Sequence, residues 1–244
     1  MMHIRRTTME NQAKEIHSLS DLIEIAEKQP SDDYVGGWFY RGQSDATWEL
    51  EPKAHRYPYS EGDGFEFKFK MWLKQSHNYP GMQYSNEMEA MAIAQHHGFA
   101  SKLLDWSSNI LTAAFFACSE NLKKDAKIFA YFPTQYIYLE NDLMAPVEIK
   151  HVVGYQPKTV TNRLKAQSGC FTYHKENDFK IENELFKPGG HNTLEEWVIP
   201  ANKKFSFLRM LDRLAINHKT LFPDLDGLSK HYCLQDEIHA IDHV

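Results

Sequence analysis

The sequence has few cysteines and none of the spacings in which cysteine and histidine commonly bind metals. Cys118, Cys170 and Cys233 lie far apart in 244 residues, and without a CxxC pair neither a zinc knuckle nor a disulfide framework is indicated. The 13 histidines include the adjacent pair His96 and His97 but form no HExxH motif. We therefore expect no metal and a reducing, cytoplasmic environment.

Long apolar runs and basic runs are absent as well. The longest apolar stretch, residues 110–118, is interrupted by Thr112 and is far shorter than the roughly 20 residues that cross a bilayer. The first six residues are followed by no apolar region, which argues against a signal peptide. A formal net charge of −6 without a basic tract disfavours bulk binding to a phosphate backbone. The sequence thus predicts no membrane association.

The sequence does contain enough apolar residues for one large core, because 42% of the chain is hydrophobic. A capping box at Ser18 predicts a helix that ends before Pro30. Further helices are predicted over residues 65–79, 86–96, 109–118, 159–166 and 205–216. Strands are predicted over 38–43, with Arg41-Gly42-Gln43 at the end of that strand, and over 128–132, 147–153, 170–174 and 195–199. Because these elements do not alternate regularly, we expect an α+β fold with a mixed, largely antiparallel sheet flanked by helices. We divide the chain into an N-terminal helical extension, residues 1–30, and a main domain, residues 31–244.

Two polar clusters interrupt the apolar pattern. Residues 39–43 read Phe-Tyr-Arg-Gly-Gln, and residues 95–107 gather Gln, His, Lys, Asp, Trp and Ser around a glycine. Residues 95–98 are predicted to end one helix at Gly98, and residues 105–107 to begin the next, with Ser107 or Ser108 as its N-cap. Several such groups at successive element ends indicate the wall of a polar cleft.

These clusters resemble the FRG-domain family, which is named for an aromatic-Arg-Gly motif. The resemblance is carried by Phe39–Gln43, Pro52, Arg56, Gln95–Gly98, Ser101–Ser107, Ala113–Ala117, Arg163, Gln167, Gly169, Phe171 and Thr172. Lys102 stands where the family usually has Arg, and Ser101 and Ser107 stand where it has Thr. Lysine keeps the charge of arginine but lacks its planar fork, so a phosphate held at position 102 would be gripped less firmly.

The order of elements is also similar, more distantly, to ADP-ribosyltransferases, which bind NAD in the cleft of a split sheet. In that comparison Arg41 ends a first strand, Asp105-Trp106-Ser107 precedes an Ala/Phe-rich helix, and Glu195 or Glu196 lies on a late strand. The resemblance implies an NAD-binding transferase or an NAD-cleaving enzyme with a nucleotide as its small-molecule partner. Fold-level likeness does not by itself establish that chemistry.

The chemistry so implied assigns a role to each candidate residue. Cleavage of the nicotinamide–ribose bond develops positive charge that a carboxylate stabilises, which we assign to Glu196 or, as second choice, Glu195, since only one of two adjacent strand residues can face the cleft. Arg41 would hold phosphate, and Ser107 would position the glutamate. Trp106 or Tyr40 would stack on the nicotinamide ring. The further cofactor-binding candidates are Gly42, Gln43, Gln95, His96, Lys102 and Asp105.

Plainer interpretations stay open beside these roles. Arg41 could pair with Asp105 to fix a strand end, since a buried charge needs a partner, and His96 could simply end a helix. The domain could be a non-catalytic module that binds a nucleotide or a nucleic-acid end. It could also be a nuclease that uses His96 or His97 with Asp105. The acceptor of a transferase could be protein, nucleic acid, a small molecule or water.

Overall fold

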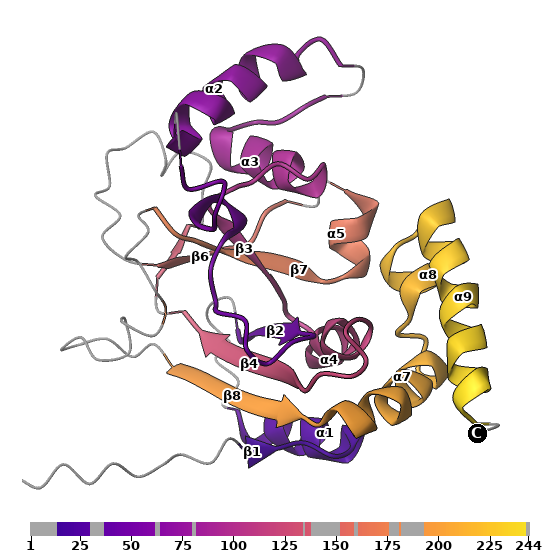
Figure 1. The fold of residues 1–244 in the computed structure, drawn as a ribbon. Helices are drawn as coiled ribbons and strands as arrows, with labels where there is room; N and C mark the ends of the chain where they lie inside the picture. Colours follow the sequence, from indigo (N-terminus) through magenta and orange to yellow (C-terminus); the bar gives the residue numbers. More distant parts are fainter. Residues whose placement is uncertain are drawn as a thin grey trace, which may run out of the picture.

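A computed structural model describes residues 14–29, 37–61, 64–79, 82–133, 135–137, 152–158, 161–175, 181 and 193–242. Its centre is one eight-stranded sheet in the order β1-β8-β4-β2-β3-β7-β6-β5 (Figure 1). The strands are β1 (Lys14–Glu15), β2 (Phe39–Gln43), β3 (Leu103–Ser107), β4 (Ala126–Phe132), β5 (Tyr136–Ile137), β6 (Val153–Tyr155), β7 (Gly169–Tyr173) and β8 (Thr193–Ile199). Only the outer pairs β1–β8 and β5–β6 are parallel among the described strands. The predicted α+β class and largely antiparallel sheet are confirmed.

Helices follow the predicted positions closely in the first two thirds of the chain. They are α1 (Leu19–Lys28), α2 (Gly64–Ser76), α3 (Glu87–His96), α4 (Ile110–Cys118), α5 (Asn162–Ala166), α7 (Lys204–Arg213), α8 (His218–Leu221) and α9 (Leu225–Asp242), with 3-10 turns η1 (Lys53–His55) and η2 (Ala201–Lys203). The capping box at Ser18 is present, and Gly98 has a φ of +89° just after the cap residue of α3. None of the described helices is both long and apolar enough to cross a membrane.

Several local predictions were wrong. Residues 105–107 do not begin a helix but form the end of β3, and α4 is capped by Asn109, whose side chain accepts a hydrogen bond from the Leu111 amide. By contrast, Arg41 to Gln43 form the end of β2, as the sequence predicted. The helix predicted to reach residue 216 ends at Arg213, and Ala215 has a left-handed φ of +60°. Residues 147–151 of one predicted strand lie outside the described residues.

The described part of the predicted N-terminal extension shares the sheet and core of the main domain. Lys14 and Glu15 of β1 pair with Trp197 and Val198 of β8. Leu22 of α1 is fully buried in the same apolar cluster as helix α4. The first predicted unit therefore adds an edge strand and a packed helix to the second.

The helices that pack on the sheet form two groups. α4 packs on β2 and β4 with α1 and α7 behind it, whereas α3 packs on β3 beside α2, and α5 on β7 (Figure 1). Two separate apolar clusters result, one around Ala113–Ala117 and one around Phe69, Met91 and Phe171. A third cluster, which includes Phe39, Trp106 and Tyr131, packs on the opposite face. The boundary between the first two clusters coincides with the junction of β2 and β3.

That junction is where the sheet opens. β2 and β3 pair at a single register position, Tyr40 with Ser107, whereas β2 pairs with β4 along its whole length. Continued antiparallel register would place Gly42 opposite Asp105, but the two strands have already diverged there. Backbone groups freed at such a split need other partners, and the polar residues of the FYRGQ segment lie at this point.

Candidate functional site

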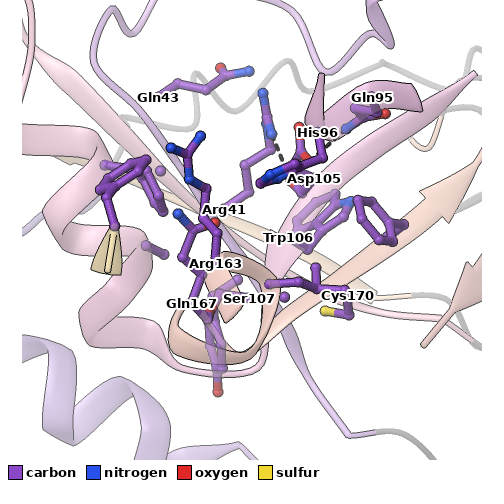
Figure 2. Close-up of a pocket in the computed structure, with 18 of the residues that line it drawn as sticks. Arg41, Gln43, Gln95, His96, Asp105, Trp106, Ser107, Arg163, Gln167 and Cys170 are labelled. Atoms are coloured by element: carbon purple, nitrogen blue, oxygen red, sulfur yellow. Dashed lines mark hydrogen bonds between the residues drawn. The ribbon is translucent and has the colours of Figure 1, made fainter. Parts of the chain in front are cut away.

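A cavity of about 400 Å³ lies at the split between β2 and β3. Its walls come from β2, β3, α3, α4, α5, β7 and the segment after α8 (Figure 2). The polar and aromatic side chains on these walls include Tyr40, Arg41, Gln43, Gln95, His96, Asp105, Trp106, Ser107, Phe116, Arg163, Gln167 and Phe222. A concave site of this size with a few convergent polar groups has the form of a small-molecule pocket.

Arg41 bridges the opened strands. Its Nη1 donates to the backbone carbonyl of Asp105 at 2.6 Å, so the guanidinium takes the place of a missing backbone donor. Its Nε is buried and has no hydrogen-bond partner. Burial lowers the pKa of Arg41 to about 10, against the opposing influence of the Asp105 carboxylate. The group stays charged at neutral pH, and the pairing expected with Asp105 goes to its main chain rather than to its carboxylate.

Asp105 is fixed by a relay of hydrogen bonds. Gln95 Nε2 donates to Asp105 Oδ1 at 2.5 Å, while Gln95 Oε1 accepts from the Ser101 hydroxyl. The second carboxylate oxygen has no donor among the described residues. An oriented carboxylate therefore lies in the same cavity as the Arg41 guanidinium. The 95–107 cluster brings these three side chains together as the sequence predicted for a cleft wall.

Gln43 and His96 are two further polar residues of the cavity wall. Gln43 is 2% exposed, and its Nε2 donates to the Glu49 carbonyl at 3.1 Å, yet its Oε1 is buried without a partner. Half-buried His96 has its pKa lowered mainly by burial and also by the charge of Arg163. The imidazole is therefore neutral at pH 7, and such a group can accept a proton.

Ser107, Tyr40 and Trp106 line the cavity but are already engaged. The Ser107 hydroxyl donates to the Gln167 carbonyl at 2.7 Å and accepts from the Asn109 amide. Tyr40 donates its hydroxyl to Gln29, and burial raises its pKa to about 12, with Glu195 adding to the effect. Trp106 is buried, and its indole N–H donates to Thr172. These contacts make Ser107 a link between β3 and α5 rather than a partner of a glutamate.

Three predicted site residues are not brought to this cavity. Glu196 shares a register row with Phe129 and Arg41, so two strand spacings of about 4.8 Å separate it from Arg41, and its carboxylate pairs with Lys127 at 3.2 Å. Glu195 shares a register row with Ala130 and Tyr40 and is likewise two strand spacings from β2. Lys102 is buried, and its ammonium contacts Glu66 at 2.5 Å and the Lys175 carbonyl at 2.7 Å. None of the three lines the cavity.

The site prediction missed two cavity residues that the sequence had already singled out. Arg163 and Gln167 belong to the late Arg-x-x-x-Gln-x-Gly motif, and both lie on or just after α5. Their spacing places them on one face of a helical turn, which was the available signal. Phe222 also lines the cavity and follows α8, a helix that was not predicted.

Comparison with known proteins finds a family similarity for part of this chain. No curated protein and no solved structure matches it significantly. Residues 36–126, which include Arg41, Gln95 and Asp105, match the family model of the FRG domain. Much of the wall of the cavity at the β2–β3 split therefore comes from the segment that is similar to the FRG domain.

Proposed function

We propose that the cavity at the β2–β3 split binds a nucleotide, that the nucleotide is NAD, and that the protein cleaves its nicotinamide–ribose bond. One observation carries the proposal: a charged guanidinium with a buried, unpartnered N–H and an oriented carboxylate share one cavity. An unpartnered buried donor is costly, and a bound phosphate oxygen would satisfy it. The carboxylate is the group that an oxocarbenium-like transition state requires.

In this proposal Arg41 binds phosphate. Nη1 is committed to the Asp105 carbonyl, which leaves Nε and Nη2 as a pair of adjacent donors. Such a pair matches two phosphate oxygens, and charge-assisted hydrogen bonds of this kind are stronger than neutral ones. Gln43, whose Oε1 lacks a donor, would accept from a ribose hydroxyl or an amino group of the base.

Because Asp105 lines the cavity and Glu196 does not, we assign the catalytic role to Asp105 instead of Glu196. The nicotinamide–ribose bond would break with its electron pair leaving on nicotinamide, and Asp105 would stabilise the positive charge that develops on the ribose. The hydroxyl of water or of an acceptor would then form the new bond to that carbon and release a proton. Neutral His96, on the same cavity wall, would take up that proton.

Replacement of Arg41 tests the phosphate role. We expect Arg41→Ala to weaken NAD binding about 10- to 100-fold, because at least one charge-assisted hydrogen bond is lost, and Arg41→Lys to recover part of the loss. Isothermal titration calorimetry with NAD measures the effect, and the melting temperature of each variant provides the control. Wild-type affinity in a folded Arg41→Ala variant would contradict the proposal.

Paired carboxylate variants test the catalytic role. Asp105→Asn keeps an acceptor for Gln95 but removes the charge, so we expect nicotinamide release from NAD to fall about 100-fold, a typical cost of losing electrostatic stabilisation. Glu196→Gln should release nicotinamide at nearly the wild-type rate. The reverse pattern would return the role to Glu196. NAD binding without any nicotinamide release by the wild type would show a binding module instead.

A further inference from the structure

A second arginine, Arg163, lines the same cavity from a different element. It lies on α5, outside residues 36–126, whereas Arg41 lies on β2 (Figure 2). Its Nη2 contacts the Asp224 carboxylate at 2.7 Å, and its guanidinium carbon is 4.9 Å from the centroid of the Phe222 ring. Its Nε is buried and has no hydrogen-bond partner, as in Arg41.

The contacts of Arg163 orient its guanidinium without using all of its donors. The carboxylate of Asp224 also accepts from the Gly227 amide at 2.8 Å. This hydrogen bond is the main reason why the pKa of Asp224 is lowered, and the hydrogen bond from Arg163 lowers it further. Asp224 is thus a fixed, charged anchor at the start of α9. The Phe222 ring lies near the guanidinium and restricts it further. The Arg163 guanidinium has five N–H donors, and one of them is used by Asp224.

We propose that Arg163 binds the second phosphate of the nucleotide, so that the cavity selects nucleoside diphosphates over monophosphates. The inference rests on the proposed nucleotide function and names the substrate class within it. Each guanidinium has an unpartnered Nε, and each can hold one phosphate group. The diphosphate of ADP or NAD supplies one phosphate group for each arginine, whereas AMP supplies a single group for both.

A purely structural role for Arg163 is the competing explanation. The ion pair with Asp224 and the hydrogen bond from Gln167 Nε2 to the Leu221 carbonyl both tie the region of α5 to the segment around α8 and α9. If Arg163 only connected these segments, its replacement would lower the stability of the fold and would weaken the binding of all nucleotides by the same factor. The ratio of ADP affinity to AMP affinity separates the two roles, because a change in stability alone does not alter it.

The experiment measures the affinities of AMP, ADP and NAD for the full chain by calorimetry. We expect the wild type to bind ADP at least about tenfold more tightly than AMP, and Arg163→Gln to lose about tenfold for ADP and NAD but less than threefold for AMP. Lys165→Gln is the matched control, since it removes a cation on the same helix that does not line the cavity. Asp224→Asn keeps an acceptor for Arg163 and should keep the preference for ADP.

The outcomes distinguish this inference from the function on which it rests. Equal losses for AMP and ADP in Arg163→Gln, or loss of the ADP preference in Lys165→Gln, would overturn the role of Arg163 while leaving NAD binding intact. If no nucleotide binds the wild type, both proposals fail. Should Arg163→Gln not fold, Arg163→Lys keeps the charge but not the planar fork. Arg163→Lys should lower the ratio of ADP affinity to AMP affinity, and an unchanged ratio in this variant would overturn the inference.

Discussion

Replacing Gly42 with alanine is expected to destabilise the fold by about 3 kcal/mol or more, at the upper end of what overpacking costs. A Cβ atom at Gly42 would lie 1.8 Å from the Ala113 carbonyl oxygen and 2.6 Å from the Ala117 nitrogen. Both atoms belong to the backbone of α4, so no side chain can rotate away. The helix itself would have to move off β2, and Ala113 and Ala114 of that helix are fully buried in the core.

The destabilisation expected for Gly42→Ala is informative because replacing glycine with alanine usually stabilises a protein. In a strand that tolerates a side chain, alanine for glycine stabilises by about 0.4–1 kcal/mol through the unfolded state. Gly98→Ala is a useful comparison: a Cβ atom there would meet no other atom within 4 Å, but the φ of Gly98 is +89°, so the change should cost only the roughly 1–2 kcal/mol of left-handed backbone. Urea unfolding of both variants measures the difference. A cost below about 1 kcal/mol for Gly42→Ala would show that α4 does not need this close approach.

The example of Gly42 shows which parts of the fold were predictable from sequence. The motif around it was recognisable, and local patterns placed β4, β7, β8 and most helices, because each depends on periodicity and caps within a short segment. The requirement for glycine at position 42 depends on a helix that begins only at Ile110, far later in the chain. Nothing in the local sequence specifies how closely that helix approaches.

The site was predictable to the same extent. Arg41, Gln95 and Asp105 could be grouped in advance because polar residues at element ends tend to line clefts. Glu196 could not be excluded, because its distance from Arg41 depends on β4 being inserted between β8 and β2. Strand order of this kind is set by long-range packing and not by the pattern of any one strand.

Lys102 illustrates a different failure. Its position in the most specific motif suggested a ligand contact, but the direction of its side chain follows from β3 and the residues just before it. The ammonium contacts Glu66 and the Lys175 carbonyl, and Lys102 does not line the cavity. A motif residue can thus be structural while its neighbours line a cavity.

Replacing Lys204 with methionine is expected to lower the free energy of unfolding by about 2–5 kcal/mol, because each buried carbonyl left without a donor costs about 1–3 kcal/mol. Lys204 is 0% exposed, although lysine is almost never fully buried without partners. Its ammonium donates to the carbonyls of Ser44 at 2.7 Å, Glu120 at 3.1 Å and Asn121 at 3.0 Å. Methionine fills a similar volume but leaves all three carbonyls without that donor.

The three carbonyls connect this network to the cavity. Ser44 and Glu120 line it, and they come from the ends of β2 and α4, the two elements that meet at Gly42. Lys204→Met should therefore weaken NAD binding as well as stability, whereas Lys203→Met, which removes an ammonium without these contacts, should change neither by more than about 0.5 kcal/mol. Urea unfolding and calorimetry on the two variants make the comparison. Equal stability of the two variants would mean that the carbonyls of Ser44, Glu120 and Asn121 find other donors, and that one buried lysine does not hold the cavity wall together.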